Sequence, residues 1–261
     1  MLRSGIAVSL VFVLLGSLSA SAVETTTHFL ETHYYLLSLG QLAVDADSVR
    51  QAAQSSGFTV VAYEGDSTEV FRGGNPVSTT AEAVLSDDQL VVVDSGRFLL
   101  RQADERFVYS VRPSEGGYDL VIDPQQDLEI TDVLGSVLMS LQAMGILGTE
   151  ASLELRAYAK DDPKGPPPPV GIAIESTLFS LLIARDWFDY AAAKGLTVLG
   201  LRVEVVAEVV PGSGLEELFA PYVIEQTDGL SKLLLPIDQL LALARSSAVA
   251  YVRSPYHPSV P

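Results

Sequence analysis

The most legible part of the chain is residues 201–261, which spell out a complete small fold by local rules and read LRVEVVAEVVPGSGLEELFAPYVIEQTDGLSKLLLPIDQLLALARSSAVAYVRSPYHPSVP. Residues 201–209 alternate apolar and polar side chains with period two, which predicts a strand with one buried face. Residues 222–226 and 230–235 flank Thr227-Asp228-Gly229, a turn signal in which glycine supplies a positive φ. These two segments therefore predict a β-hairpin.

Two helices are expected around this hairpin. Ser213 and Glu216 have the spacing of a capping box, which predicts a helix with an apolar stripe that ends at Pro221. Pro236 suits the first turn of a second helix, and a last strand is expected at 248–253. The expected stripes are Leu215, Leu218 and Phe219 in the first helix, and Ile237, Leu240, Leu241 and Ala244 in the second. The predicted order is βαββαβ, a ferredoxin-like module.

Residues 240–244 read LLALA, and residues 249–255 read VAYVRSP, which has the pattern V-x-Y-V-x-x-P. In these motifs the stretch resembles the inhibitory pro-domains of subtilisin-like proteases, and especially the pro-domain-like modules of secreted surface proteins. In that family the four-stranded sheet packs against the protease, and the tail after the last strand enters the active-site cleft. By resemblance the tail here is 254–261. The residues expected to contact a partner are Tyr251, Arg253, Pro255, Tyr256 and His257.

The N-terminus has the pattern of a secretory signal peptide. Arg3 precedes an apolar run from Ile6 to about Leu18, and Ala20-Ser21-Ala22 fits the small-x-small rule for cleavage. We expect residues 1–22 to be removed, giving a secreted, periplasmic or cell-surface protein. An uncleaved anchor is the alternative, although the run is shorter than the ~20 residues that a spanning helix needs. No membrane span is expected after signal removal.

The composition excludes several functional classes. The 261 residues carry 16 Lys+Arg and 33 Asp+Glu, a net charge of −17, which repels phosphate backbones and makes nucleic acid an improbable partner. The chain has no cysteine, which excludes disulfides and thiolate chemistry. Hydrophobic residues make up 48% of the chain, enough to bury two cores.

An α+β domain is expected over 23–160, with an antiparallel sheet and covering helices. Residues 25–39 favour either a helix or a strand around Tyr34-Tyr35-Leu36-Leu37, and the sequence does not decide between them. Asp47 is expected to cap a helix that ends at Gly57, and Thr131 to cap a helix over 132–144 that covers one sheet face. The strand candidates are 58–63, 68–72, 82–85, 90–93, 97–101, 107–112, 118–122 and 153–159.

The segment 161–169 contains four consecutive prolines and is expected to be a linker or a long hairpin loop. After it, Ser176 is expected to cap one helix that closes at Lys194-Gly195. This helix and the βαββαβ module make up the predicted region 170–261.

The sequence carries no strong catalytic or metal motif. His28 and His33 are five residues apart and so face different sides of a helix, and no serine lies in a hydrolase motif. Asp94-Ser95-Gly96 resembles the aspartic-protease turn only locally, because that mechanism needs two aspartates, and an ordinary turn is the favoured interpretation. No cofactor and no metal are expected.

The leading hypothesis is an exported non-enzymatic protein that acts by protein–protein contact. Its partner would be a subtilisin-like protease or another extracytoplasmic protein, and its module would act either as an inhibitor or as a docking surface. The alternative is a small-molecule or lipid carrier, whose meander and covering helix would enclose an apolar cavity. An enzyme of unrecognised type is a third, weaker hypothesis.

Overall fold

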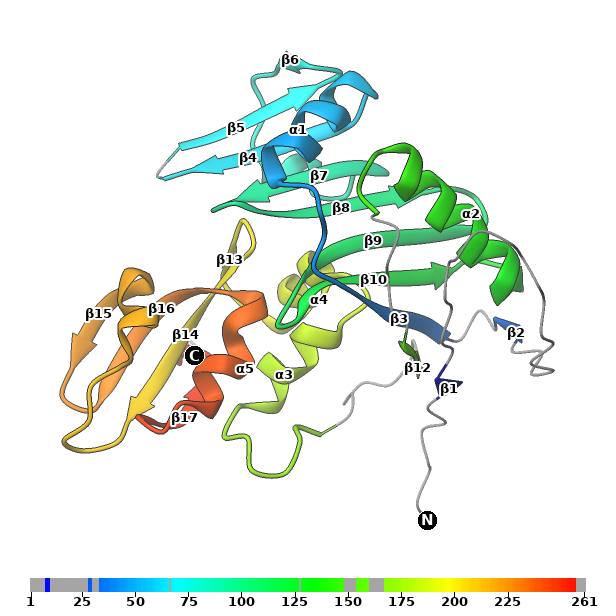
Figure 1. The fold of residues 1–261 in the computed structure, drawn as a ribbon. Helices are drawn as coiled ribbons and strands as arrows, with labels where there is room; N and C mark the ends of the chain where they lie inside the picture. Colours follow the sequence, from blue (N-terminus) through cyan, green and yellow to red (C-terminus); the bar gives the residue numbers. More distant parts are fainter. Residues whose placement is uncertain are drawn as a thin grey trace, which may run out of the picture. The chain divides into compact units, whose positions relative to one another are not determined.

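A computed structural model describes residues 8–9, 28–29, 33–65, 67–126, 128–147, 154–159 and 167–256. The chain divides into two compact units, Met1–Asp161 and Asp162–Pro261, and both contain helices and strands (Figure 1). The mixed α+β class is therefore confirmed. Apart from Val8–Ser9, the predicted signal peptide lies outside the described residues, as do residues 160–166 of the proline-rich segment. Among the described residues no helix is long and apolar enough to span a membrane.

The N-terminal unit is built on a ten-stranded sheet in the order β1-β12-β3-β10-β9-β8-β7-β4-β5-β6. A separate short ladder joins β2 (His28–Phe29) to β11 (Leu128–Glu129). The strands of the large sheet are β1 (Val8–Ser9), β3 (His33–Gly40), β4 (Thr59–Glu64), β5 (Ser67–Arg72), β6 (Asn75–Pro76), β7 (Gln89–Asp94), β8 (Arg97–Ala103), β9 (Phe107–Ser114), β10 (Gly117–Pro124) and β12 (Glu154–Ala159). Seven of the eight predicted strand segments are thus strands, and β3 decides the 25–39 segment in favour of a strand.

The prediction of a wholly antiparallel sheet is wrong at one pair, because β4 and β7 run parallel. The predicted strand at 82–85 is instead a 3-10 helix, η1 (Glu82–Val84), which follows buried Ala81 and ends at buried Val84. Their three-residue spacing puts both side chains on one side of a 3-10 turn. The chain therefore leaves β4 through β5, β6 and η1, and returns in the same direction as β4.

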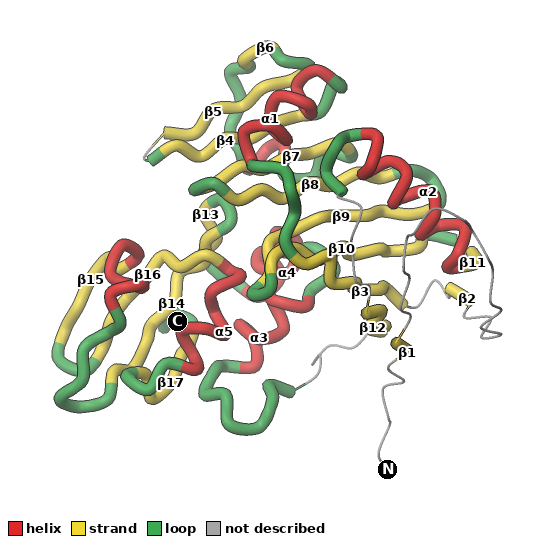
Figure 2. The backbone as a smooth tube through the Cα atoms, in the orientation of Figure 1, coloured by secondary structure: helices red, strands yellow, loops and turns green. Residues whose placement is uncertain are grey.

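Two helices cover one face of this sheet (Figure 2). α1 (Ala46–Ser55) and α2 (Ile130–Ala143) contribute Val49, Ala53, Val137 and Leu141 to the cluster that also contains Val91, Leu100, Val111 and Leu120 of the strands. The prediction that the second helix covers the sheet is confirmed.

The predicted caps are wrong. Asp45, not Asp47, caps α1 by accepting from Ser48 N at 2.7 Å, and α2 begins before Thr131.

The C-terminal unit contains a second sheet in the order β13-β14-β16-β15, with β17 on β14. Its strands are β13 (Val198–Leu199), β14 (Arg202–Val209), β15 (Val223–Thr227), β16 (Leu230–Pro236) and β17 (Val249–Arg253). The period-two prediction for β14 is confirmed, since Val203, Val205 and Ala207 are buried and the residues between them are half-buried. The predicted hairpin is also confirmed, and Gly229 has φ +79° in its turn.

The helices of this unit differ from expectation in two places. The predicted capping-box helix is a 3-10 helix, η2 (Glu217–Tyr222), which contains Pro221 and has no side-chain cap; Phe219 is buried but Leu218 is 58% exposed. Gly212 and Gly214, on either side of Ser213, favour a loop there. The predicted single helix is two, α3 (Ser176–Ile183) and α4 (Trp187–Lys194), because Asp186 caps a new start by accepting from Phe188 N and Asp189 N. Glu175, not Ser176, is the N-cap residue of α3.

The last predicted helix is present as η3 (Ile237–Gln239) followed by α5 (Leu240–Arg245). Ile237, Leu240, Leu243 and Ala244 are buried, while Leu241 is only half-buried. α5 contacts β17, and α3 contacts α5 (Figure 1). The helices therefore lie against the sheet face that carries Val203, Val205 and Ala207.

Candidate functional site

The opposite face of the C-terminal sheet holds the sequence-predicted contact residues that lie in a strand. Pairing register places Val206 beside Lys232 and Arg253, Glu208 beside Tyr251, and Glu204 beside Leu234. Residues that are directly opposed in neighbouring strands project to the same side. We call this set the outer face: Arg202, Glu204, Val206, Glu208, Lys232, Leu234, Tyr251 and Arg253.

Two ion pairs flank the apolar centre of the outer face. Lys232 Nζ lies 2.8 Å from Glu204 Oε1, and Arg253 Nε lies 3.1 Å from Glu208 Oε1. Val206 and Leu234, which lie next to these pairs by register, are half-buried. The arrangement is an apolar centre with a charged rim, as is common in protein–protein interfaces.

The predicted contact residues lie in two places. Tyr251, 37% exposed, and Arg253 belong to the outer face, whereas Pro255 and Tyr256 follow the last strand. Tyr256 is 83% exposed and Pro255 is half-buried. His257 lies outside the described residues. The structure therefore brings Tyr251 and Arg253 together, and it leaves Tyr256 available at the start of the tail.

A segment before α3 fixes the point where the tail leaves the sheet. Val252 N donates to Ala173 O at 2.9 Å, and Glu175 N donates to Val252 O at 2.8 Å, so this segment runs parallel to β17. Ser254 donates to Glu175 Oε2 through both its backbone N and its Oγ, each at 2.7 Å. Glu175 therefore sets the direction of the chain after Arg253.

Sequence reasoning missed Glu175 because the two partners are 79 residues apart and no local pattern joins them. It also missed the paired role of Glu208, although the period-two pattern of 201–209 put Glu208 on the same side as Val206.

We predict that Glu175→Ala lowers the free energy of unfolding of this unit by about 1 to 2 kcal/mol. Two hydrogen bonds to a carboxylate are lost at a half-buried position, where water replaces them in part. Urea titration followed by the fluorescence of Trp187, the chain's single tryptophan, measures the change. Glu216→Ala, at an exposed residue without a cap bond, is the matched control. If the losses of unfolding free energy for Glu175→Ala and Ser254→Ala add fully in the double variant, the hydrogen bonds between these two residues are contradicted.

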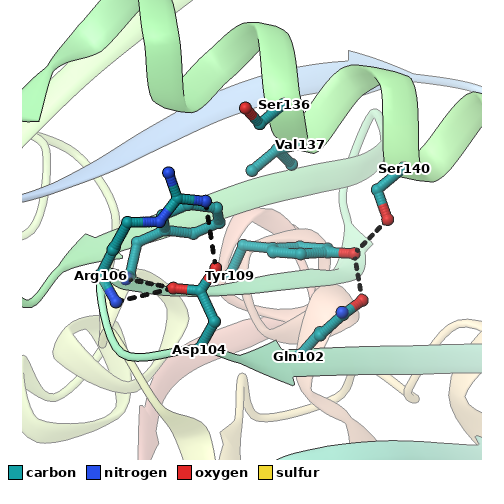
Figure 3. Close-up of a pocket in the computed structure, with 8 residues that line it drawn as sticks. Gln102, Asp104, Arg106, Tyr109, Ser136, Val137 and Ser140 are labelled. Atoms are coloured by element: carbon teal, nitrogen blue, oxygen red, sulfur yellow. Dashed lines mark hydrogen bonds and ion pairs between the residues drawn. The ribbon is translucent and has the colours of Figure 1, made fainter.

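The N-terminal unit contains a pocket of about 160 Å³ between α2 and the β8–β9 strands (Figure 3). The buried Tyr109 hydroxyl donates to Gln102 Oε1 at 2.7 Å and lies 3.2 Å from Ser140 Oγ on α2. Burial raises the pKa of Tyr109 above its usual value, so the hydroxyl keeps its proton at neutral pH. The Tyr109 hydroxyl therefore connects β8 to α2 by hydrogen bonds and does not act as a base.

Asp104 and Arg106 lie at the other end of the pocket. Asp104 Oδ1 accepts from Arg106 N at 2.7 Å and Phe107 N at 3.0 Å, while Arg106 Nη2 lies 3.5 Å from Asp104 Oδ2. The Arg106 guanidinium is 5.4 Å from the centre of the Phe107 ring. The pocket therefore combines fixed polar groups with an aromatic wall.

One sequence motif has a structural role. Asp94-Ser95-Gly96 ends β7 and forms the turn to β8, with φ of +52° at Ser95 and +75° at Gly96, as the turn interpretation predicted. Ser95 Oγ donates to Asp94 Oδ1 at 2.9 Å. Within the described ranges, no group of three or more histidine or carboxylate residues is placed to hold a metal ion.

Comparisons of the chain with protein-family models, with curated proteins and with solved structures find no match.

Proposed function

We propose that this is an exported, non-enzymatic protein that acts by protein–protein contact through the outer face and tail of its C-terminal unit. The observation that carries the proposal is the two-sided C-terminal sheet. One side packs under helices, and the other has a half-buried apolar centre between ion pairs. Such a face suits a partner that covers Val206 and Leu234 and keeps the charged rim hydrated.

The strand order supports a ferredoxin-like, pro-domain-like module. In chain order the four main strands are β14, β15, β16 and β17, and their spatial order is β17-β14-β16-β15 with every pair antiparallel. This is the order expected when each βαβ half crosses over one strand. The module departs from the pattern at its first crossover, which contains η2 in place of an α-helix.

The charge and the tail favour a protein partner of the subtilisin type. The net charge of −17 opposes nucleic acid, and two hydrogen bonds from Ser254 to Glu175 hold the start of the tail. Prolines at 255, 258 and 261 reduce the entropy that the tail loses when it binds in a cleft. Because proline lacks an N–H, the tail would also form fewer backbone hydrogen bonds there. If the module is an inhibitor, the tail occupies the active-site cleft of the protease. If it is a docking module, the sheet binds the partner and the tail is not needed.

The carrier alternative needs a large apolar cavity, and the N-terminal core supports the contact hypothesis instead. Val137 and Leu141 of α2 and the inward side chains of β7 to β10 pack into one buried cluster. The pocket beside it, about 160 Å³ and partly polar, is smaller than the ~300–1,000 Å³ that a drug-sized ligand or a lipid occupies. This pocket does not suit a lipid.

A pull-down from the native extracellular fraction tests the contact proposal. The mature protein, a Leu234→Arg variant and a Met139→Arg control serve as baits; Met139 is 72% exposed on α2 of the other unit. We expect the wild type and the control to retain the same partner proteins. The amount retained by Leu234→Arg should be at least tenfold lower, because the substitution places a charge in the apolar centre. Identical retention by all three baits would reject the outer face as the binding surface.

A further inference from the structure

We infer that the pocket between α2 and the β8–β9 strands binds one neutral sugar ring. This site is separate from the outer face and does not depend on the function proposed for it. Its lining comes from three elements and the loop between two of them. Gln102 lies on β8, Asp104 and Arg106 on the β8–β9 loop, Tyr109 on β9, and Ser136 and Ser140 on α2 (Figure 3).

The size of the pocket limits the ligand to a single ring. Its volume of about 160 Å³ is close to that of a protein cavity of ~150 Å³ known to hold benzene. A group the size of one six-membered ring therefore fits, so a pyranose would enter with part of its ring and keep its remaining hydroxyls at the open side, whereas a drug-sized ligand or a lipid chain does not fit.

The lining groups suit a ring that carries hydroxyls on an apolar frame. Phe107 and Val137 supply apolar surface, while Gln102 and Arg106 supply donors, and Asp104 and Ser140, whose proton goes to Tyr109, supply acceptors. Because Gln102 Oε1 accepts the Tyr109 proton, its amide nitrogen is the atom oriented to donate to a ligand. A polyol can use donors and acceptors at once.

Charge excludes the other small polar ligands. The Asp104 carboxylate lies 3.5 Å from Arg106, so the two charges largely cancel within the pocket. A small anion would in addition meet the repulsive field of a chain with net charge −17, and the neutralised Asp104–Arg106 pair offers a small cation no net negative charge to bind. A neutral ligand is not subject to these electrostatic effects.

The site is organised before a ligand enters. Tyr109 is only 3% exposed, and its hydroxyl joins Gln102 on β8 to Ser140 on α2. Three elements are thus held in one geometry, which lowers the ordering cost of binding.

Titration of the full chain with methyl pyranosides of glucose, galactose and mannose, followed by amide NMR shifts, tests the inference. We expect saturable shifts on β8, β9 and α2 for at least one sugar, with a Kd on the order of 1 mM, as suits a ligand of this size. A second arm uses disaccharides that end in the same sugars. Equal or tighter binding there would identify the end of a glycan as the source, and binding of the monosaccharide alone would identify a free sugar.

Two variants locate the site. Ser136→Phe places an aromatic ring over the pocket from the exposed surface of α2 and should weaken binding at least tenfold, whereas Met139→Phe on the same helix should not. Arg106→Met keeps an apolar contact with Phe107 but removes the donors, and should weaken binding several-fold. Absence of shifts with every sugar at roughly a hundredfold the expected Kd, or wild-type affinity of Ser136→Phe, would overturn the inference.

Discussion

Replacing Leu240 with alanine is expected to lower the free energy of unfolding of the C-terminal unit by about 2 to 5 kcal/mol. Leu240 is fully buried at the start of α5, the helix that packs against β17. Truncation removes apolar contacts and leaves a cavity that the surrounding strands fill only in part. The expected loss exceeds that for Glu175→Ala, because water cannot replace the contacts of a fully buried leucine.

Trp187 makes the measurement specific to this unit. It is the only tryptophan, it is 2% exposed, and it lies on α4 within Asp162–Pro261. Its fluorescence in a urea titration therefore follows the C-terminal unit in the intact chain. Leu218→Ala, at a leucine that is 58% exposed, should change the midpoint little. An unchanged midpoint for Leu240→Ala would mean that α5 does not hold the sheet together.

Deletion of residues 254–261 is expected to have the largest effect on function. If the module inhibits a subtilisin-like protease, removal of the tail should weaken inhibition at least tenfold, because the tail is the part that would occupy the cleft. Binding through Val206 and Leu234 should survive in part, since the outer face is retained. Initial rates and equilibrium binding, measured on the same samples, separate the two effects.

Loss of inhibition can be attributed to the tail only if the truncated chain keeps its fold. Ser254 is lost with the tail, so Glu175 loses a hydrogen-bond partner and the melting temperature should fall modestly. Glu175→Ala in the full-length chain reproduces that loss while retaining the tail, and is the matched control. Full inhibition by the truncated chain would contradict a role of the tail in the cleft and would leave only binding by the sheet.

Local patterns predicted most strands, because their signals lie within a few residues. The alternation in 201–209 predicted which side of β14 is buried, and Gly229 marked the hairpin. The helix starts were less accurate. Asp45 caps α1 where Asp47 was expected, since several polar residues next to a helix start can each accept from the first turn. Asp186 starts a second helix within the segment where one helix from Ser176 was expected.

Features that join distant segments could not be predicted from local pattern. The parallel pairing of β4 with β7 depends on how the intervening chain crosses, and the sequence of either strand alone allows both directions. The contact of Glu175 with Ser254 and the link from Tyr109 to Ser140 join residues far apart in the chain. The pocket and the direction of the tail were therefore missed, and the prediction that Tyr251 and Arg253 contact a partner rests on a family-like signature alone.

We propose that the C-terminal unit contacts a subtilisin-like protease through its outer face. Titration of such proteases with the purified full chain, with binding and steady-state rates measured together, tests this contact. We expect saturable binding and competitive inhibition, with Leu234→Arg at least tenfold weaker than wild type. Neither binding nor inhibition by several such enzymes at micromolar protein, with the wild-type melting transition intact, would contradict it.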